Sequence, residues 1–368
     1  MPSEPCDIVA LGDAIVDVIA RTSDRFLDEA GITKGTMRLL ADGEAEALAA
    51  SMARLEVEEI PGGSAANTLA GVAALGTRAG FIGQIGADRL GRRFADDLAA
   101  LGIAFDTPPV EAPTGRCFIL VTPDAQRTMQ TSPGASHRLS ADALDEDAIR
   151  GARLLFLEGY LWGPARPRAA MARAIALARG EGRQIAFTIS DSIALPGRRE
   201  SLVKLCEDGG VDILFANAYE ACLLAGVSDL QAAMKVLSRL VPTLVVTRGA
   251  AGALAQSDGG QVEIDAFPAE RIVDTTGAGD QFAAGFLAAH VAGRDLQACL
   301  EGGGRAAAAV IAHVGARPMI ARERLMPELS TPELAMPQAI KRAGVMRVPD
   351  ASTSESASSN PSAEGSEQ

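Results

Sequence analysis

Short apolar runs alternate with helical segments along most of the chain, and this alternation constrains the fold more than any other feature. The apolar runs are too short for helices, and alanine- and leucine-rich segments with helical spacing separate them. The apolar runs fall at 6–11, 79–82, 154–157, 185–189, 213–215 and 244–247, and the helical segments at 45–55, 66–75, 90–101, 168–179 and 231–240. Strands that are apolar on both faces and are joined through helices form a parallel sheet, so we expect an α/β fold with helices on both faces of a mostly parallel sheet.

Two stretches, 18–40 and 114–131, interrupt this rhythm. In the second, Cys117, Ile119 and Val121 alternate with other residues, which is typical of antiparallel strands with one exposed face. We expect a small β-sheet that is either a lid over a site or an extension of the main sheet. The expected core comprises 1–12, 45–107 and 133–345, and the expected lid comprises 13–44 and 108–132.

The last residues, 346–368, are expected to be a disordered tail. From Asp350 onward the chain consists of Ser, Glu, Ala, Pro and other residues without a large apolar side chain. Such a segment cannot bury enough surface to offset the entropy of ordering.

The charge balance limits the partners. The chain has 368 residues, with 34 Lys and Arg against 47 Asp and Glu, which gives a formal net charge of −13. So acidic a chain lacks the attraction to polyanions that sustains binding to nucleic acid or to a membrane surface. We therefore expect small-molecule ligands only, and any bound phosphate must be held locally. A monomer and a homodimer both remain open.

Cysteine and histidine usage argues against a structural metal or disulfide framework. The five cysteines form no CxxC pair, and the three histidines have no zinc-ligand spacing. No basic segment precedes an apolar stretch at the start, and no run of 18 apolar residues occurs. These features predict a reduced, cytoplasmic protein.

One turn carries the strongest chemical signal. Residues 274–280 read Asp-Thr-Thr-Gly-Ala-Gly-Asp and lead directly into a helix. A helix N-terminus offers free backbone N–H groups and the positive end of the helix dipole, which together form a cradle for an anion. Asp280 at this cradle is either a base that accepts a proton during phosphoryl transfer or a helix cap. No lysine follows a glycine, so the chain has no Walker A motif, and GxGxxG, HRD and DFG are also absent.

Residues 274–287 resemble the C-terminal signature of the ribokinase-like (PfkB) family of carbohydrate and nucleoside kinases. Three further segments are similar to the family's motifs and occur in the same order, over about residues 6–320. They are 61–67, similar to the di-glycine hinge and substrate asparagine; 83–91, similar to the N-terminal signature; and 217–220, similar to the NxxE motif near magnesium. Residues 12–17, 122–129 and 158–162 most resemble bacterial adenosine-kinase-like members, while Gln130 and Pro133 depart from their pattern.

The resemblance implies transfer of the γ-phosphate of ATP to the primary (5'-type) hydroxyl of a nucleoside, with adenosine as the leading acceptor. A kinase for ribose, fructose or a related sugar is the alternative within the family, and a non-catalytic sugar or nucleotide sensor is the alternative from another class. The implied cofactors are ATP and Mg²⁺, with a monovalent cation at Asp274 as a further option. The implied site residues are Asp280, Gly277, Ala278 and Gly279 for catalysis; Asp13, Asp17, Gly62, Gly63, Asn67 and Tyr160 for the acceptor; Asn217, Thr247, Arg248, Gly249, Gly252 and Thr276 for the nucleotide; and Glu220, through water, for the metal.

On the acceptor side, the residues also support these roles on physical grounds. Asp17 follows the first strand, where open α/β folds place ligands, and a carboxylate there can accept two sugar hydroxyls. It can also be a simple turn aspartate. Gly62 and Gly63 permit a hinge or a plain loop. Tyr160, with Trp162 beside it, can stack on a base or fill the core.

On the nucleotide side, the same residues again allow two interpretations each. Asn217 and Glu220 are three residues apart and share a helix face, so they form either a water-mediated magnesium site or a capping pair. Gly249 and Gly252 follow an apolar strand and suit a turn beside phosphates. Arg248 lies between this strand and Gly249, and it either binds phosphate or is solvated.

Overall fold

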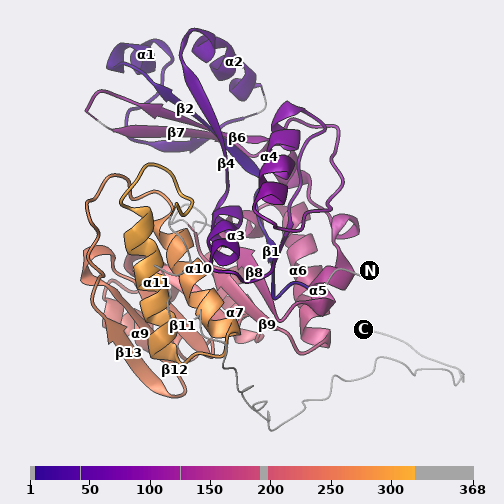
Figure 1. Cartoon of the computed structure of the whole chain (residues 1–368), viewed down its shortest axis with the longest axis vertical. Helices are drawn as coiled ribbons and strands as arrows, with labels where there is room; N and C mark the ends of the chain where they lie inside the picture. Colours follow the sequence, from indigo (N-terminus) through magenta and orange to yellow (C-terminus); the bar gives the residue numbers. More distant parts are fainter. Residues whose placement is uncertain (1–4, 42, 125, 191–197, 320–368) are drawn as a thin grey trace, which may run out of the picture. The chain divides into compact units, whose positions relative to one another are not determined.

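The computed structural model describes residues 5–41, 43–124, 126–190 and 198–319, all of which lie in one compact unit that ends at Leu334. The expected disordered tail, 346–368, lies outside the described residues. Figure 1 shows a large α/β core with a smaller β-sheet lid above it.

The core contains an eight-stranded sheet in the order β13-β12-β11-β10-β9-β8-β1-β5. The strands β1, β5, β8, β9, β10 and β11 are parallel, whereas β12 and β13 are antiparallel and extend the sheet beyond β11. Their bounds are β1 (Ile8–Leu11), β5 (Ala79–Ile82), β8 (Leu154–Glu158), β9 (Gln184–Thr188), β10 (Ile213–Asn217), β11 (Thr243–Thr247), β12 (Ala253–Ser257) and β13 (Gly260–Ile264). Each predicted apolar run is confirmed as a parallel strand of this sheet.

Helices cover both faces of the core sheet, as predicted. The side chains of Ile8 and Ala10 point to one face and those of Val9 and Leu11 to the other, and all four are fully buried. The first face packs against α3 (Ser64–Ala74), α4 (Arg89–Ala100), α10 (Ala278–Val291) and α11 (Leu296–Val310). The second packs against α5 (Glu146–Gly151), α6 (Ala165–Gly180), α7 (Arg199–Glu207), α8 (Ala218–Ala225) and α9 (Leu230–Leu237). Burial on both faces explains why the strands read as continuous apolar runs.

The lid is a five-stranded sheet in the order β3-β7-β6-β2-β4. The bounds are β2 (Ile15–Arg21), β3 (Met37–Leu39), β4 (Val57–Gly62), β6 (Gly115–Val121) and β7 (Arg127–Ser132). The expected antiparallel hairpin over 114–131 is confirmed as β6 and β7, but β2 pairs in parallel with β6 and antiparallel with β4. One face packs against α1 (Asp24–Glu29) and α2 (Glu44–Ser51), and the other carries alternate residues such as Asp17 and Ile119 that line a cavity.

The predicted lid boundaries are wrong at two places. The helical segment from residue 45 belongs to the lid, because Leu48 and Met52 join the cluster of apolar side chains around Phe118 that backs the lid sheet. β4 then pairs along its whole length with β2, so the lid continues to Gly62. Residues 108–112 belong to the core instead, since Val110 pairs with Gly86 there.

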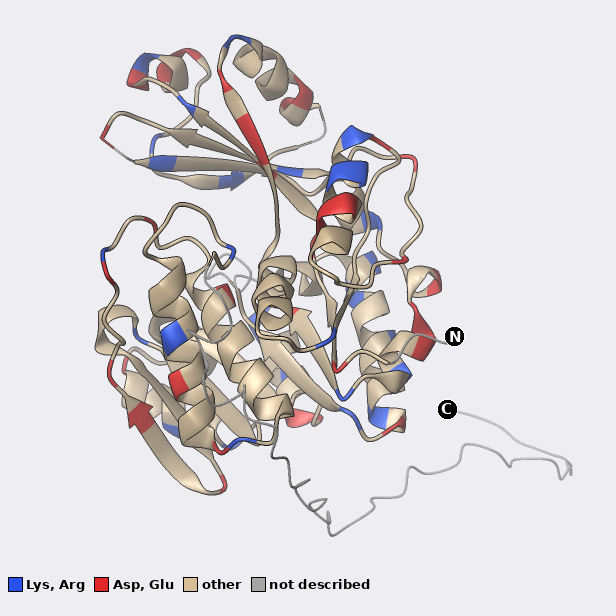
Figure 2. Ribbon diagram, viewed as in Figure 1, with Lys and Arg blue, Asp and Glu red and all other residues tan. Residues whose placement is uncertain are grey.

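The surface carries charges of both signs. In Figure 2 basic and acidic segments are interspersed over the lid and along α4. None of the helices in the described ranges has the length and apolar character needed to cross a membrane.

Candidate active site

The turn before α10 has the geometry expected for an anion cradle. Gly277 is the N-cap of α10 with φ 75°, and a Cβ there would lie 2.5 Å from the Cβ of Ala316. Only glycine fits this position. At Gly279, one position inside the helix N-terminus, a Cβ would meet no atom within 4 Å. The backbone of this turn is therefore open to a phosphate group beside the N–H groups of the first helical turn.

Asp280 is held by the first turn of α3 and does not act as a helix cap. Ser64 Oγ donates a hydrogen bond to Oδ1 of Asp280 at 2.7 Å, and Asn67 Nδ2 donates to Oδ2 at 3.2 Å. Burial raises the pKa of Asp280, although these two hydrogen bonds oppose the rise. A fixed carboxylate with a raised pKa, next to an anion cradle, is suited to accept a proton from a hydroxyl.

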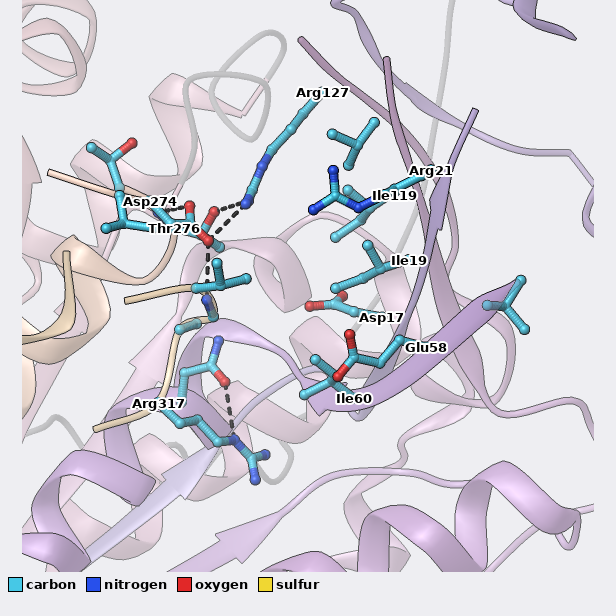
Figure 3. Close-up of a pocket in the computed structure, with 18 of the residues that line it drawn as sticks. Asp17, Ile19, Arg21, Glu58, Ile60, Ile119, Arg127, Asp274, Thr276 and Arg317 are labelled. Atoms are coloured by element: carbon cyan, nitrogen blue, oxygen red, sulfur yellow. Dashed lines mark hydrogen bonds and ion pairs between the residues drawn. The ribbon is translucent and has the colours of Figure 1, made fainter. Parts of the chain in front are cut away.

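A cavity of about 1200 Å³ lies between the lid and the core (Figure 3). Asp17, predicted to bind the acceptor, projects into it from β2, and Asn67 lines it from the core. Burial raises the pKa of Asp17 to about 7; Arg317 and Arg127 lower it, and Asp280 adds to the rise. The cavity thus brings two predicted acceptor residues next to the predicted base.

The lid side of this cavity carries a group of aliphatic side chains among charged ones such as Arg21 and Glu58. Ile19, Ile60, Ile119 and Val121 project into it from adjacent strands, and Arg21 lies at its outer end (Figure 3). The residues expected to stack on a base do not line the cavity: Trp162 is 7% exposed and packs edge-on against Phe187 in the core. Its indole Nε1 donates to Ser201 Oγ at 3.2 Å.

Tyr160 also lies outside the cavity lining. It is partly buried in the short helical turn Gly159–Trp162 that follows β8. Because aromatic residues are only 4% of the chain, Tyr160 and Trp162 stood out after one strand. Their spacing did not show on which side of the sheet they would lie.

Gly62 and Gly63 allow two chain segments to approach each other closely. A Cβ at Gly62 would lie 2.8 Å from Oδ2 of Asp17, and one at Gly63, where φ is 90°, would lie 2.2 Å from the carbonyl oxygen of Asp13. Asp13 itself is 7% exposed and accepts a hydrogen bond from Ser136 Oγ, and it does not line the cavity. The structure therefore places Asp13 behind the site.

Arg127 reaches from lid strand β7 to the turn before α10, a role that its sequence pattern did not indicate. Its guanidinium donates to Thr276 Oγ1 and pairs with Asp274 at 2.7 Å (Figure 3). Burial works to raise the pKa of Asp274, but hydrogen bonds from Gly315, Thr276 and Arg127 outweigh it and lower the pKa. An arginine at the start of a strand gave no signal without knowledge of how the lid folds over the core.

A monovalent cation does not fit at Asp274 as the residues stand. Oδ1 accepts from the N–H of Thr276 at 2.9 Å, and Oδ2 accepts from the N–H of Gly315 at 3.0 Å and from Arg127. The positive charge beside this carboxylate is the guanidinium of Arg127.

Arg317 is a second cavity residue that the sequence pattern did not indicate. It lines the cavity from the segment after α11, its Nε donates to Oδ1 of Asn67 at 3.4 Å, and it forms an ion pair with Asp97. Asn67 is therefore fixed at both ends of its amide, by Arg317 and by Asp280.

Asn217 and Glu220 form a capping box at the start of α8. Asn217 Oδ1 accepts from the N–H of Glu220, and Glu220 Oε2 accepts from the N–H of Asn217, both at 2.8 Å. Among the described residues no group of three His, Cys, Asp or Glu could enclose a metal. A single buried carboxylate fits Mg²⁺ that keeps its waters and binds mainly through substrate phosphates.

The residues after β11 form a tight turn. Thr247 is in register with Asn217 at the ends of adjacent strands. Arg248 pairs with Glu263 at 2.7 Å and donates to the carbonyl of Ala251, so it holds the turn. Gly249 and Gly252 both have positive φ, 59° and 80°, which explains glycine there without a ligand. None of these residues lines the large cavity, so their role toward a nucleotide stays a prediction.

The chain is similar in sequence and in structure to known proteins. The family model for pfkB family carbohydrate kinases matches residues 7–322. Guanosine-inosine kinase of Escherichia coli K12 is 28% identical over 233 residues, which cover 60% of this chain and 53% of that protein, so the chain spans about half of its length. A nucleoside kinase of Methanothermobacter thermautotrophicus is 30% identical over 269 residues, covering 72% of this chain and 81% of that protein.

The crystal structure of adenosine kinase from Sinorhizobium meliloti superposes with a TM-score of 0.81 at 39% identity, covering 89% of this chain and 100% of that one. Together with the core and lid sheets, these matches define the class as ribokinase-like α/β proteins. The chain belongs to the pfkB family of carbohydrate kinases, and its α/β ribokinase-like fold confirms the resemblance noted in the sequence.

Proposed function

We propose that the protein transfers the γ-phosphate of ATP to the primary hydroxyl of a nucleoside, with adenosine as the leading acceptor. The observation that carries this proposal is the position of Asp280 in the first turn of α10, where it is held by Ser64 and by Asn67, a residue that lines the cavity. The similarity to an adenosine kinase over nearly the whole chain supports the nucleoside.

In this proposal Asp280 accepts the proton of the attacking hydroxyl. Gly277, Ala278 and Gly279 expose the backbone that receives the transferring phosphoryl group, and Thr276 lies beside them. Such a reaction depends mainly on positioning and on neutralising the phosphate charge. Arg127, already at the turn, supplies positive charge from the lid side.

The acceptor is held by Asp17 and Asn67 through its ribose hydroxyls, and its base lies against the aliphatic underside of the lid. Ile19, Ile60 and Ile119 offer apolar surface that a free sugar would leave uncovered. This surface takes the place of the stacking rings expected from the sequence and is the feature that favours a nucleoside over ribose or fructose.

Mg²⁺ bound with ATP supplies charge neutralisation at the phosphates, and Glu220 is its candidate contact through water. The capping box fixes the Glu220 carboxylate at the C-terminal end of β10, where ligands of parallel sheets bind. Asn217 and Thr247 lie at the same edge of the sheet.

Steady-state rates of ADP release with adenosine, guanosine, inosine, ribose and fructose, at matched ATP, test the proposal. We expect adenosine to have the highest kcat/KM. Faster turnover of ribose or fructose would replace the nucleoside by a sugar and leave the phosphoryl-transfer proposal standing. The absence of ADP release with every acceptor, together with binding of one of them, would favour a non-catalytic sensor.

A further inference from the structure

A fully buried glutamate, Glu158, ends the central strand β8 directly behind the active site. Its side chain is 0% exposed, and both carboxylate oxygens accept backbone N–H groups. Oε1 accepts from Asp13 at 2.5 Å and Oε2 from Ala65 at 2.7 Å. Burial, together with the nearby Asp13, raises the pKa of Glu158 well above its ordinary value, against the two hydrogen bonds. Burying a carboxylate costs free energy, so we looked for a role that the contacts of Glu158 could have.

The two N–H groups belong to two of the places where the chain passes between core and lid. Residues 12–14 join core strand β1 to lid strand β2, and residues 62–64 join lid strand β4 to core helix α3. The two crossings also touch each other, because a Cβ at Gly63 would lie 2.2 Å from the carbonyl oxygen of Asp13. Glu158 thus links both crossings to the core sheet.

Both crossings lead directly into functional side chains. Asp17 lies four residues beyond Asp13 on β2. On the other crossing, Ala65 is the second residue of α3, between Ser64 and Asn67, which hold Asp280. A shift of either crossing would move the acceptor-binding carboxylate or the donors to Asp280.

We propose that Glu158 is a positioning residue that fixes both core–lid crossings and so sets Asp17 and the Asp280 donors in the geometry needed for phosphoryl transfer. The inference rests on the proposed function for the roles of Asp17 and Asp280. In this proposal Glu158 does not contact the acceptor, since it is fully buried and does not line the cavity.

The kinetic test is Glu158→Gln, which keeps the size of the side chain but sets an amide NH₂ against one of the two N–H donors. We expect kcat to fall roughly 10- to 100-fold, as for small misplacements of reacting groups. We expect the KM for the acceptor to rise and the KM for ATP to stay the same, at temperatures well below the Tm of the variant.

Asp212→Asn is the matched control. Asp212 is a buried carboxylate of the same sheet that accepts from the backbone N–H of Ile185 at 2.8 Å and pairs with Arg179 at 2.6 Å. Asp212 precedes β10 and so lies where the parallel strands begin, whereas the site lies where they end. We expect this variant to lower Tm and to leave kcat and both KM values unchanged. Glu158→Gln with a lower Tm but unchanged kcat and acceptor KM would overturn the proposal.

Hydrogen exchange on the ligand-free wild type tests the clamp, meaning the hydrogen bonds from the N–H groups of Asp13 and Ala65 to Glu158, without any substrate or variant. The amide of Ala65 is in the first turn of a helix, where N–H groups have no intrahelical partner and normally exchange fast. Bonded to Glu158, it should exchange slowly. Gly279, at the same position of α10, whose N-cap provides no side-chain acceptor, should exchange fast.

Equal, fast exchange at Ala65 and Gly279 would overturn the clamp even if Glu158→Gln fails to fold. Because this measurement needs no acceptor, it separates a failure of the clamp from a failure of the proposed function. Slow exchange at Ala65 combined with no phosphorylation of any acceptor would leave the clamp and reject the reaction.

Discussion

Asp280 and Asp17 are both partly buried carboxylates near the cavity, but their partners differ. Asp280 is fixed by two hydrogen bonds from α3, whereas the main opposing influence on Asp17 is the charge of Arg317. The first carboxylate is therefore held in one orientation, as a base must be, while the second is available to a ligand.

Asp280→Asn should lower kcat by roughly 10²-fold or more, the scale of a lost general base. Its Tm should not fall, because the change removes a carboxylate whose pKa is raised by burial. Asp295→Ala is the control: Asp295 caps α11 by accepting from the N–H of Ala298 at 2.8 Å, and alanine cannot replace this contact. Loss of that cap should cost about 0.5–2 kcal/mol of stability without changing kcat. Turnover of Asp280→Asn within a few-fold of the wild type would contradict the assignment.

The raised pKa of Asp17 predicts that pH has opposite effects on stability and on acceptor binding. Its folded pKa of about 7 lies above the ordinary value of 3.8, so ionisation favours the unfolded state and stability falls as pH rises between these values. Asp17→Asn should therefore have a higher Tm than the wild type at pH 8 and an equal one near pH 4. Acceptor affinity of the wild type should weaken as pH falls through about 7, because the carboxylate is lost.

Thermal unfolding and acceptor titrations over this pH range check both halves. Asp258→Asn, an exposed change in the turn between β12 and β13, should show neither effect. A Tm difference between Asp17→Asn and the wild type that is the same at pH 4 and pH 8 would show that the Asp17 carboxyl is not perturbed by burial.

Residue patterns predicted the reactive turn better than its surroundings. The Gly-Ala-Gly turn and Asp280 were visible because a turn into a helix N-terminus is local in sequence. Arg127, Arg317 and Glu158 act across 147, 250 and 145 residues of sequence separation, to Asp274, Asn67 and Asp13 respectively. Contacts of that span depend on how the lid folds over the core, which periodicity does not show.

At the scale of elements, the lid sheet shows why its two faces have different sequences. Val18, Ala20, Phe118 and Leu120 pack under α1 and α2, and the alternate positions on β2 and β6 face the cavity. Alternation predicted the strands β6 and β7. It did not predict that α2 and β4 join them, because a helical pattern does not reveal which sheet a helix covers.

Arg127→Met should weaken the closed lid, because it removes the hydrogen bond to Thr276 and the ion pair to Asp274. We expect kcat/KM for the acceptor to fall roughly 10- to 100-fold, the scale for misplaced groups at a reaction centre. Arg116→Met is the control, since Arg116 pairs with Glu46 at 2.7 Å within the lid. It should leave kcat/KM unchanged.

The same contact predicts the response of the wild type to monovalent salt. Because Arg127 already provides the positive charge at Asp274, replacing potassium by choline at constant ionic strength should leave the rate unchanged. Strong activation by potassium would contradict this and show that an ion takes the place of the guanidinium.

At the scale of the whole molecule, the core and lid account for the apolar burial of the described chain. Truncation after Arg347 removes a segment whose sequence has almost no apolar side chains to bury. We expect it to change neither Tm nor kcat by a measurable amount. A clear drop in either would mean that residues 348–368 contribute to the folded protein.

The acceptor should stabilise the whole molecule, because in the proposed function it binds Asp17 of the lid and Asn67 of the core, which both line the cavity. A ligand that binds only the folded state adds about 2.7 kcal/mol of stability at 100 times its Kd. Asp280→Asn makes this measurable without turnover. Adenosine should raise the Tm of this variant more than guanosine or inosine, and ribose should have almost no effect, because a free sugar does not cover the aliphatic underside of the lid. Ribose and adenosine producing equal shifts at equal saturation would show that this surface does not select the base.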